Sequence, residues 1–261
     1  MYTKIVFLCE DFYSKTMQET VMRLDKFLAD AGIGTRSEVK TAIRKKQVTV
    51  NTLVVTDPGV SVSDADTVCY KNTPIGAAKP RYYMMHKPGG CVSATKDNEM
   101  TVLDYVPESE RKNLFPVGRL DKDTEGLLLL TDDGMFAHNL TSPRKHVDKT
   151  YYFEGEGVLA EDAAKQMAVG IDIGDEKPTK SARLEIEEIL SSKHKVTGRL
   201  TISEGRYHQV KRMLAKMGVT ITYLKRLSIG GVCLDERLEK GQYRELTPEE
   251  IKRLTEKRNK K

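Results

Sequence analysis

The sequence predicts an α+β fold in two parts: a small αα-β module, then a larger domain built on a mainly antiparallel sheet flanked by helices. The length of 261 residues is comfortable for two domains, because domains usually contain roughly 100 to 200 residues. The hydrophobic fraction of 39% supports a packed core. Beyond Pro80, short runs with strand character are separated by helical patterns, which favours an α+β domain.

The small module begins at Met22. Residues 1–21 are expected to form an N-terminal extension, and Met22 is a candidate natural start. Apolar positions from Leu24 to Ala31 have helical spacing, and Gly32 stops this helix. A second helix follows, with Thr35 or Ser37 as its cap. Its solvent side is strongly basic and is expected to contact RNA through Arg36, Arg44, Lys45 and Lys46.

Strands complete this module. Val48–Val50 and Leu53–Val55 predict a hairpin around Asn51 and Thr52, and the valines near residues 60 to 68 predict further strands. Residues 71–80, rich in small residues and proline, read as a linker. The expected domains are therefore 22–78 and 79–254, followed by a basic tail at 255–261.

The larger domain is predicted from its apolar runs. The expected strands are Tyr82–Met85, Leu127–Thr131, Lys149–Glu154, Arg199–Ser203 and Ile221–Leu224. The clearest helical patterns are Ala160–Val169 and Tyr207–Met217, and Gly218 caps the second of them.

Positive charge is concentrated rather than spread evenly over the chain, whose net charge is +5. Residues 196–231 hold seven Lys or Arg against one acid, and residues 22–50 hold seven against three. The four cysteines are far apart and form no zinc-ligand pattern, so a reduced cytoplasm and no metal are expected. No apolar run approaches the length of a membrane span, and the N-terminus lacks the features of a secretory signal.

The most unusual segment runs from Gly118 to Gly134 and has three carboxylates in five positions, at Asp121, Asp123 and Glu125. One interpretation is a charged loop followed by a buried strand and a tight turn at residues 133–134. Another is a calcium loop of the EF-hand type, which would also use Asp132. The residues around the segment do not predict the helices that such a loop needs. A third interpretation is a carboxylate that serves as a nucleophile or base.

Two further segments contain groups that suit a nucleic acid. A glycine turn at Gly205 leads into a helix whose first turns carry phosphate-binding and hydrogen-bonding side chains, namely Arg206, His208, Gln209, Lys211 and Arg212. A solvated basic helix is the alternative. The second segment is the aromatic strand 149–153, in which a tyrosine either belongs to the core or stacks on an unpaired base.

Together these segments resemble the small-subunit type of ribosomal pseudouridine synthases, which join an S4-like RNA-binding domain to a catalytic domain. The resemblance covers Met22 to about Leu254. It rests on five catalytic-domain motifs in the family's order after the S4-like module, namely Lys87-Pro88-Gly89-Gly90, Gly118-Arg119-Leu120-Asp121, Lys149-Thr150-Tyr151, Gly205 to Met213 and Ile229-Gly230-Gly231.

The resemblance implies a role for individual residues. Asp121 would be the essential carboxylate, Tyr151 the ring that stacks on the target uracil, and Lys211 the cation paired with Asp121. Arg119 would fill the space left by a flipped base. At Lys211 many relatives carry Arg, and at His86 they often have Asn, so the local geometry at both positions is open.

The function implied by the resemblance is isomerisation of one uridine in 16S ribosomal RNA, of the position-516 type, to pseudouridine. No cofactor is expected, because no atoms are gained or lost. The expected partner is ribosomal RNA or a small-subunit assembly intermediate, the expected location is the cytoplasm, and the expected state is a monomer. Two alternatives stay open: the same chemistry on 23S or another RNA, and a non-catalytic ribosome-associated RNA-binding protein.

Overall fold

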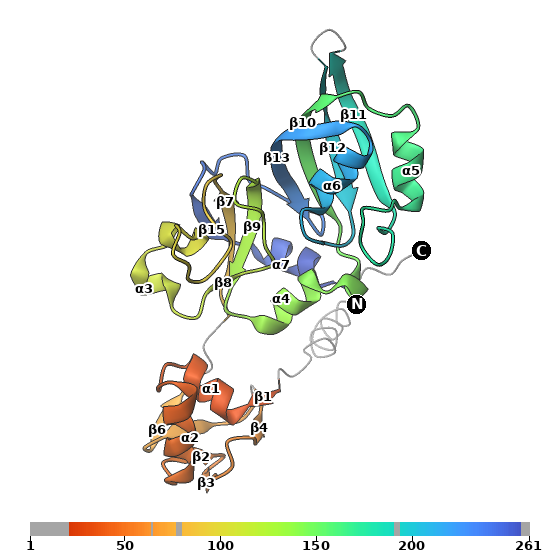
Figure 1. The fold of residues 1–261 in the computed structure, drawn as a ribbon. Helices are drawn as coiled ribbons and strands as arrows, with labels where there is room; N and C mark the ends of the chain where they lie inside the picture. Colours follow the sequence, from red (N-terminus) through yellow and green to blue (C-terminus); the bar gives the residue numbers. More distant parts are fainter. Residues whose placement is uncertain (1–20, 64, 77–79, 191–193, 257–261) are drawn as a thin grey trace, which may run out of the picture. The chain divides into compact units, whose positions relative to one another are not determined.

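The computed structural model describes residues 21–63, 65–76, 80–190 and 194–256, and the chain divides into two compact units between residues 79 and 80 (Figure 1). The predicted α+β class is confirmed. Within the described part of the chain, no helix is both long and apolar enough to cross a membrane. The expected extension at 1–21, except Val21, and the end of the expected tail, at 257–261, lie outside the described residues.

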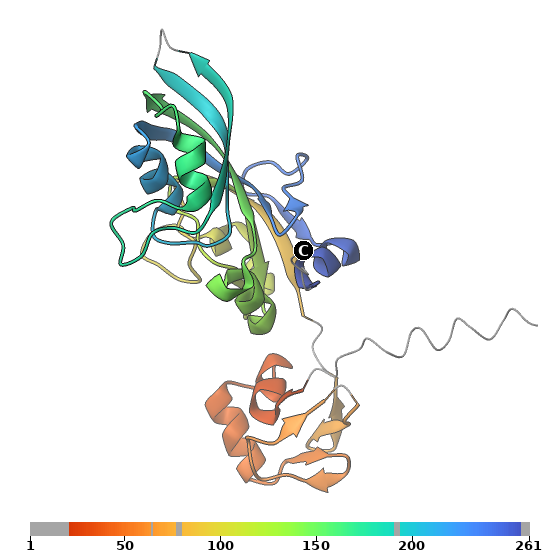
Figure 2. The same ribbon diagram turned by 90° about the vertical axis from the view of Figure 1, so that its right-hand side faces the viewer.

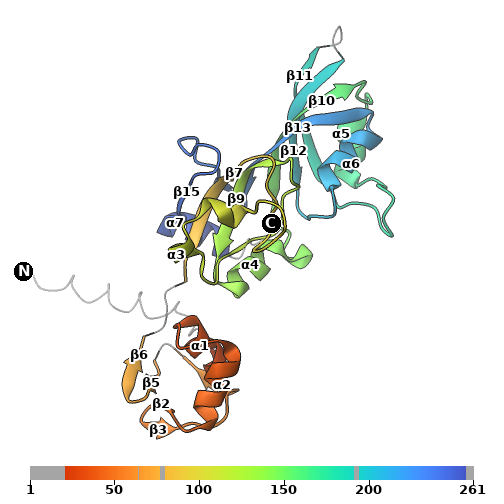
Figure 3. The ribbon, with the colours of Figure 1, turned by 60° about the vertical axis from the view of Figure 1, so that its left-hand side comes forward.

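The smaller unit packs two helices against short strands. Figure 3 shows α1 and α2 side by side in this unit. Their buried faces and the strands share one core around Leu24, Leu28 and Ile43. The elements are β1 (Met22–Arg23), α1 (Leu24–Asp30), α2 (Arg36–Arg44), β2 (Val48–Val50), β3 (Leu53–Val54), β4 (Ser61–Val62), β5 (Val68–Tyr70) and β6 (Thr73–Ile75).

Local signals explain most of this unit. Thr35 caps α2 by accepting a hydrogen bond from the Glu38 amide, while the Glu38 carboxylate accepts one from the Thr35 amide. The predicted hairpin is confirmed as β2 and β3. The predicted linker at 71–80 is wrong in its first half, because β6 lies there and pairs with β5.

The larger unit is built on a nine-stranded sheet with the strand order β11-β12-β10-β13-β9-β7-β15, to which β14 and β8 add at β13 and β9. The strands are β7 (Tyr82–Lys87), β8 (Phe115–Pro116), β9 (Glu125–Thr131), β10 (Lys149–Gly157), β11 (Ala182–Leu190), β12 (Lys195–Ile202), β13 (Val219–Ile229), β14 (Val232–Cys233) and β15 (Tyr243–Glu245). The helices are α3 (Glu108–Arg111), α4 (Gly134–Thr141), α5 (Ala163–Val169), α6 (Gln209–Lys216) and α7 (Pro248–Thr255), with short 3₁₀ turns at Val102–Tyr105 and Pro143–Lys145.

Both faces of this sheet are covered, which explains the four consecutive leucines of β9. Side chains alternate across a strand. Leu128 and Leu130 therefore join a core that includes residues of α5 and α6, whereas Leu127 and Leu129 join a second core with residues of α4 and α7. Figure 2 shows α5 and α6 on the same face of strands β10 to β13.

A short parallel contact joins the two antiparallel halves of the sheet. β9 and β13 pair in parallel at only two positions, Glu125 with Lys225 and Gly126 with Arg226. The other strand pairs of the sheet are antiparallel. Gly126 has a φ of +102°, and a Cβ there would lie 2.3 Å from the Arg226 carbonyl oxygen. This parallel contact between β9 and β13, called the seam below, therefore requires glycine at position 126.

Candidate active site

Asp121 lies in the loop between β8 and β9, and this loop is fixed mainly by buried hydrogen bonds. The Ser93 hydroxyl accepts a hydrogen bond from the Leu120 amide and donates one to the Leu120 carbonyl, each at 3.0 Å. The Gly90 amide donates to the Lys122 carbonyl at 2.8 Å, and the Thr124 amide donates to the Asp121 carbonyl at 3.1 Å. The position of Asp121 is thus set by segments far from it in the sequence.

Lys87, which is fully buried at the end of β7, also constrains this loop. Its ammonium donates to the carbonyls of Thr124 at 2.9 Å, Pro88 at 3.0 Å and Lys122 at 3.2 Å. Burial lowers the pKa of this amine, although nearby acidic groups oppose the shift. Three carbonyl oxygens therefore compensate the loss of hydration of the buried ammonium, and these hydrogen bonds attach the loop that carries Asp121 to the end of β7.

Tyr151 lies on β10, between β12 and β13, and is 7% exposed. The pairing with β13 shifts register between Thr150 and Tyr151. The guanidinium of Arg226, on β13, lies 6.0 Å from the centroid of the Tyr151 ring. The ring therefore packs in the core on one face of the sheet and borders the cavity beside Asp121.

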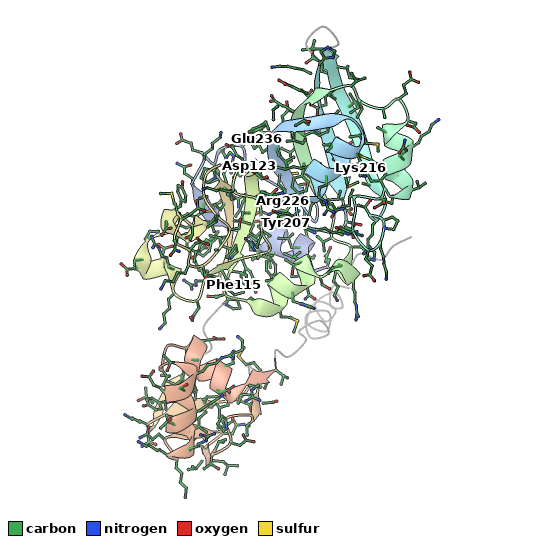
Figure 4. The ribbon with its side chains drawn as sticks, in the orientation of Figure 1. Phe115, Asp123, Tyr207, Lys216, Arg226 and Glu236 are labelled. Atoms are coloured by element: carbon green, nitrogen blue, oxygen red, sulfur yellow. The ribbon has the colours of Figure 1, made fainter. Side chains whose placement is uncertain are left out.

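Helix α6 carries the third part of the site. The helix begins at Gln209, two residues later than predicted, because His208 adopts a left-handed conformation with a φ of +49°. The His208 ring stacks on Tyr207, with centroids 3.9 Å apart. Figure 4 labels Tyr207, which is 78% exposed. Lys211 is the third residue of the helix and lies in its first turn.

Asp121, His208 and Lys211 meet at a cavity of about 60 Å³, which Arg119, Tyr151, Arg206 and Gln209 also line. The Lys211 ammonium is 3.5 Å from Asp121 Oδ2, and His208 Nε2 is 3.5 Å from Asp121 Oδ1. A positive neighbour stabilises the ionised form of a carboxylate. The arrangement therefore places one acid, four basic groups and an aromatic ring around one opening.

Lys211 has a second and closer partner, which the sequence did not predict. Its ammonium is 2.7 and 2.8 Å from the two oxygens of Asp123. Partial burial raises the pKa of Asp123, but the hydrogen bond and charge of Lys211 outweigh it and leave the pKa below its usual value. The Asp123 side chain is 73% exposed, against 27% for Asp121. Lys211 therefore bridges an outer and an inner carboxylate.

Three of the predicted RNA contacts on this side are engaged within the protein. The Arg206 guanidinium donates to the carbonyls of Lys177 at 2.6 Å and Pro178 at 2.7 Å. That of Arg212 donates to the Ile173 carbonyl at 2.6 Å, and both arginines pair with Asp175. Gln209 is buried, and its amide donates to Glu204. Their contact with RNA stays a prediction.

Of the other predicted RNA contacts, His208 faces Asp121, and the remaining five are open. Arg119 is exposed at the rim of the cavity. Four cations of the smaller unit are exposed, and among the described residues they have no hydrogen-bond or ion-pair partner through their side chains: Arg36, Arg44, Lys45 and Lys46. The two predicted basic surfaces therefore differ in how freely their charges face solvent.

The calcium-loop alternative does not fit this structure. Asp132 pairs with Arg81, and Glu125 bonds Lys240 and Tyr223. Glu125 also lies within β9 rather than in a loop. Among the described residues, no group of three or more His, Cys, Asp or Glu is placed to hold a metal ion.

Sequence reasoning missed three contributors to the site. Lys87 ends the largely apolar strand β7, and that contrast was the available signal. Arg226 follows Lys225 in a strand that also contains Thr and Ser, so no such contrast marked it. Asp123 was noted as part of the acidic segment, but its pairing with Lys211 spans 88 positions. No spacing rule connects residues so far apart.

Comparison with protein families adds two matches. Residues 81–216 match the family model described as RNA pseudouridylate synthase, and residues 22–68 match the S4 domain. The first match contains Asp121, Tyr151 and Lys211, and the second contains the basic side of α2.

Individual proteins are similar over most of their length. An uncharacterised RNA pseudouridine synthase of Bacillus subtilis is 44% identical over 238 residues, which are 90% of this chain and 99% of the relative. The ribosomal small subunit pseudouridine synthase A of Escherichia coli is 43% identical over 233 residues, 88% of this chain and 98% of the relative. A crystal structure of a pseudouridylate synthase, 41% identical, covers 89% of this chain and 99% of its own, with a TM-score of 0.64.

Proposed function

We propose that this chain, which belongs to the RNA pseudouridylate synthase family, converts one uridine of small-subunit ribosomal RNA to pseudouridine with Asp121 as its essential carboxylate. The observation that carries the proposal is the meeting of Asp121, Tyr151 and Lys211 at one cavity. These residues come from a loop, a strand and a helix that are distant in the sequence.

The choice of substrate rests on similarity and on charge. The relative from Escherichia coli is named for the ribosomal small subunit, and it is similar along nearly its whole length. We therefore propose 16S RNA, at the position-516 type of site, either free or in an assembly intermediate in the cytoplasm. Residues 22–78 would bind RNA through the open cations of α2, and residues 79–254 would perform the chemistry.

The reaction exchanges one glycosidic bond for another. The bond from ribose C1′ to uracil N1 breaks, the base turns, and a bond from C1′ to C5 forms. The proton lost from C5 is balanced by the proton gained at N1, so no oxidant or group donor is consumed. The uridine must first leave its stack, which costs a few kcal/mol.

The residues around the cavity suit these steps. The Tyr151 ring can stack on the extruded base and offset the cost of unstacking. Attack at C1′, addition at C6 and removal of a sugar proton all use a carboxylate, and Asp121 has Lys211 and His208 3.5 Å from its two oxygens. Arg119, exposed at the rim, would occupy the space that the base leaves in the RNA.

The test compares two neighbouring carboxylates. Ribosomal RNA from cells that lack this gene is mapped for pseudouridine after complementation with wild type, Asp121→Asn or Asp123→Asn. We expect one modified uridine in 16S RNA to be lost, to return with wild type, and to stay absent with Asp121→Asn. Asp123→Asn should restore it, because the inner carboxylate and its cation remain.

The same experiment separates the alternatives. A modification lost from 23S RNA instead would move the substrate to the large subunit. An unchanged map, with intact binding of ribosomal RNA by the purified protein, would favour a non-catalytic binding protein. Restoration by Asp121→Asn would contradict the role proposed for Asp121.

A further inference from the structure

A second cavity, of about 100 Å³, lies beside the candidate active site. It shares Arg119, Tyr151 and Gly205 with the first cavity, so Tyr151 forms part of both walls. Its other lining residues include two cations, Lys149 on β10 and Arg226 on β13, and no aspartate or glutamate. None of the steps proposed above uses these two cations.

Arg226 is unusual because it is charged, 2% exposed and incompletely bonded. Its Nε donates to the Leu127 carbonyl at 2.8 Å, and its guanidinium faces the Tyr151 ring. One terminal nitrogen, Nη2, is buried and has no hydrogen-bond partner. A buried donor without a partner is costly, and more so on a charged group.

Lys149 adds a second positive charge at the same place. Its ammonium donates to the Val147 carbonyl at 2.8 Å. Burial, together with the charge of Arg226, lowers the pKa of Lys149 to about 8, although the neighbouring Asp148 opposes the shift. Two like charges in a protein interior repel each other, and a bound anion would relieve both this repulsion and the unpaired donor.

We propose that this second cavity binds a phosphate group of the RNA strand next to the target uridine. The inference rests on the proposed function, because it takes the nucleotide held at Tyr151 as the neighbour of that phosphate. An ammonium and a guanidinium are the groups that bind phosphate oxygens most strongly in proteins. Arg119, at the rim of both cavities, would face the same stretch of backbone.

The first test measures binding against salt, with the full chain carrying Asp121→Asn so that turnover does not interfere. A phosphate contact changes the slope of log K against log salt by about 0.7 for single-stranded RNA. We expect Lys149→Met to reduce the slope by about that amount and to weaken binding about tenfold. Lys165→Met, which removes an exposed charge from α5 outside both cavities, should leave the slope unchanged.

The second test locates the phosphate. RNA fragments that contain the target uridine are made with one neutral methylphosphonate linkage at a time. A neutral linkage at one position beside the uridine should weaken RNA binding about tenfold in the protein that keeps Lys149. The same linkage should not weaken binding further in Lys149→Met. If each neutral linkage lowers the RNA affinity of both proteins by the same factor, the proposal is overturned.

Two controls keep the outcomes distinct. If the cations serve only the fold, Lys149→Met will melt at a lower temperature with an unchanged salt slope, and that result overturns the proposal. If the slope falls while the wild type modifies no uridine in cells, the cavity binds an RNA phosphate and the proposed function is what fails.

Discussion

Two basic helices of this protein look alike in sequence and differ in structure. At the two ends of α2 in the smaller unit, Arg36 and the C-cap residue Lys45 are exposed and unpaired among the described residues. At the start of α6 in the larger unit, Arg206 and Arg212 are bound to Asp175 and to carbonyls of the segment 173–178. The first pair is available to a ligand without rearrangement, whereas the second is occupied by the protein itself.

The difference teaches that a count of charges does not measure a binding surface. A solvated cation loses little when a phosphate replaces water and counterions. A cation that already donates to carbonyls and a carboxylate must give up those bonds first. We therefore expect α2 to contribute mainly to RNA affinity, and the arginines near α6 to contribute mainly to the fold around the site.

Substitution of Arg212 should have the largest effect on stability. Arg212→Met leaves the Ile173 carbonyl and Asp175 without this donor, and the loss of such charge-assisted bonds costs about 1.5–3 kcal/mol. Thermal unfolding of Arg212→Met and of Arg44→Met measures the contrast. A melting temperature for Arg212→Met equal to that of the wild type would mean that the two helices do not differ as described.

Removal of open charges from the two ends of α2 should change RNA affinity and leave stability nearly unchanged. The double substitution Arg36→Gln and Lys45→Gln is expected to weaken RNA binding on the order of tenfold and to lower the salt slope by about 1.5. Stability should change by less than about 0.5 kcal/mol, because neither side chain has a partner in the part of the chain that the structure describes. Unchanged binding together with a lower melting temperature would reverse our assignment.

Asp175→Asn offers the finest test, through its pH dependence. The hydrogen bond from Arg212, assisted by Arg206 and opposed by burial, holds the pKa of Asp175 below its usual 3.8. Its contribution to stability is therefore complete above pH 4 and is lost as the pH falls further. The melting-temperature difference between wild type and Asp175→Asn should shrink below pH 4, and a constant difference would exclude this ion pair as its cause.

The fold was predictable where local patterns determine it. The leucines of β9 and the Thr35 cap of α2 both lie where the sequence indicated. The turn expected at residues 133–134 is instead the start of α4, because the Asp133 side chain accepts from the Met135 and Phe136 amides. Turns and helix caps use the same Asp signal, so the neighbouring packing decides between them.

The candidate site was predictable only in its list of members. Motif resemblance selected Asp121, Tyr151 and Lys211, and the structure brings all three to one cavity. The motif resemblance could not predict the bridge from Lys211 to Asp123 or the burial of Lys87, because both depend on contacts between distant strands and loops. Their roles in catalysis stay predictions for the experiments above.

The seam at Gly126 has a consequence for the order in which the enzyme matures. Apart from the edge pair of β7 and β15, the antiparallel parts of the large sheet form from contacts nearer in sequence than the seam. The seam joins positions about a hundred residues apart and so closes at a greater entropic cost. Asp121 belongs to one side of that closure, and Tyr151 and Lys211 belong to the other. A newly made chain would thus bring Asp121 beside Tyr151 only after the parts on each side of the seam have formed, and a molecule with an open seam would be catalytically silent.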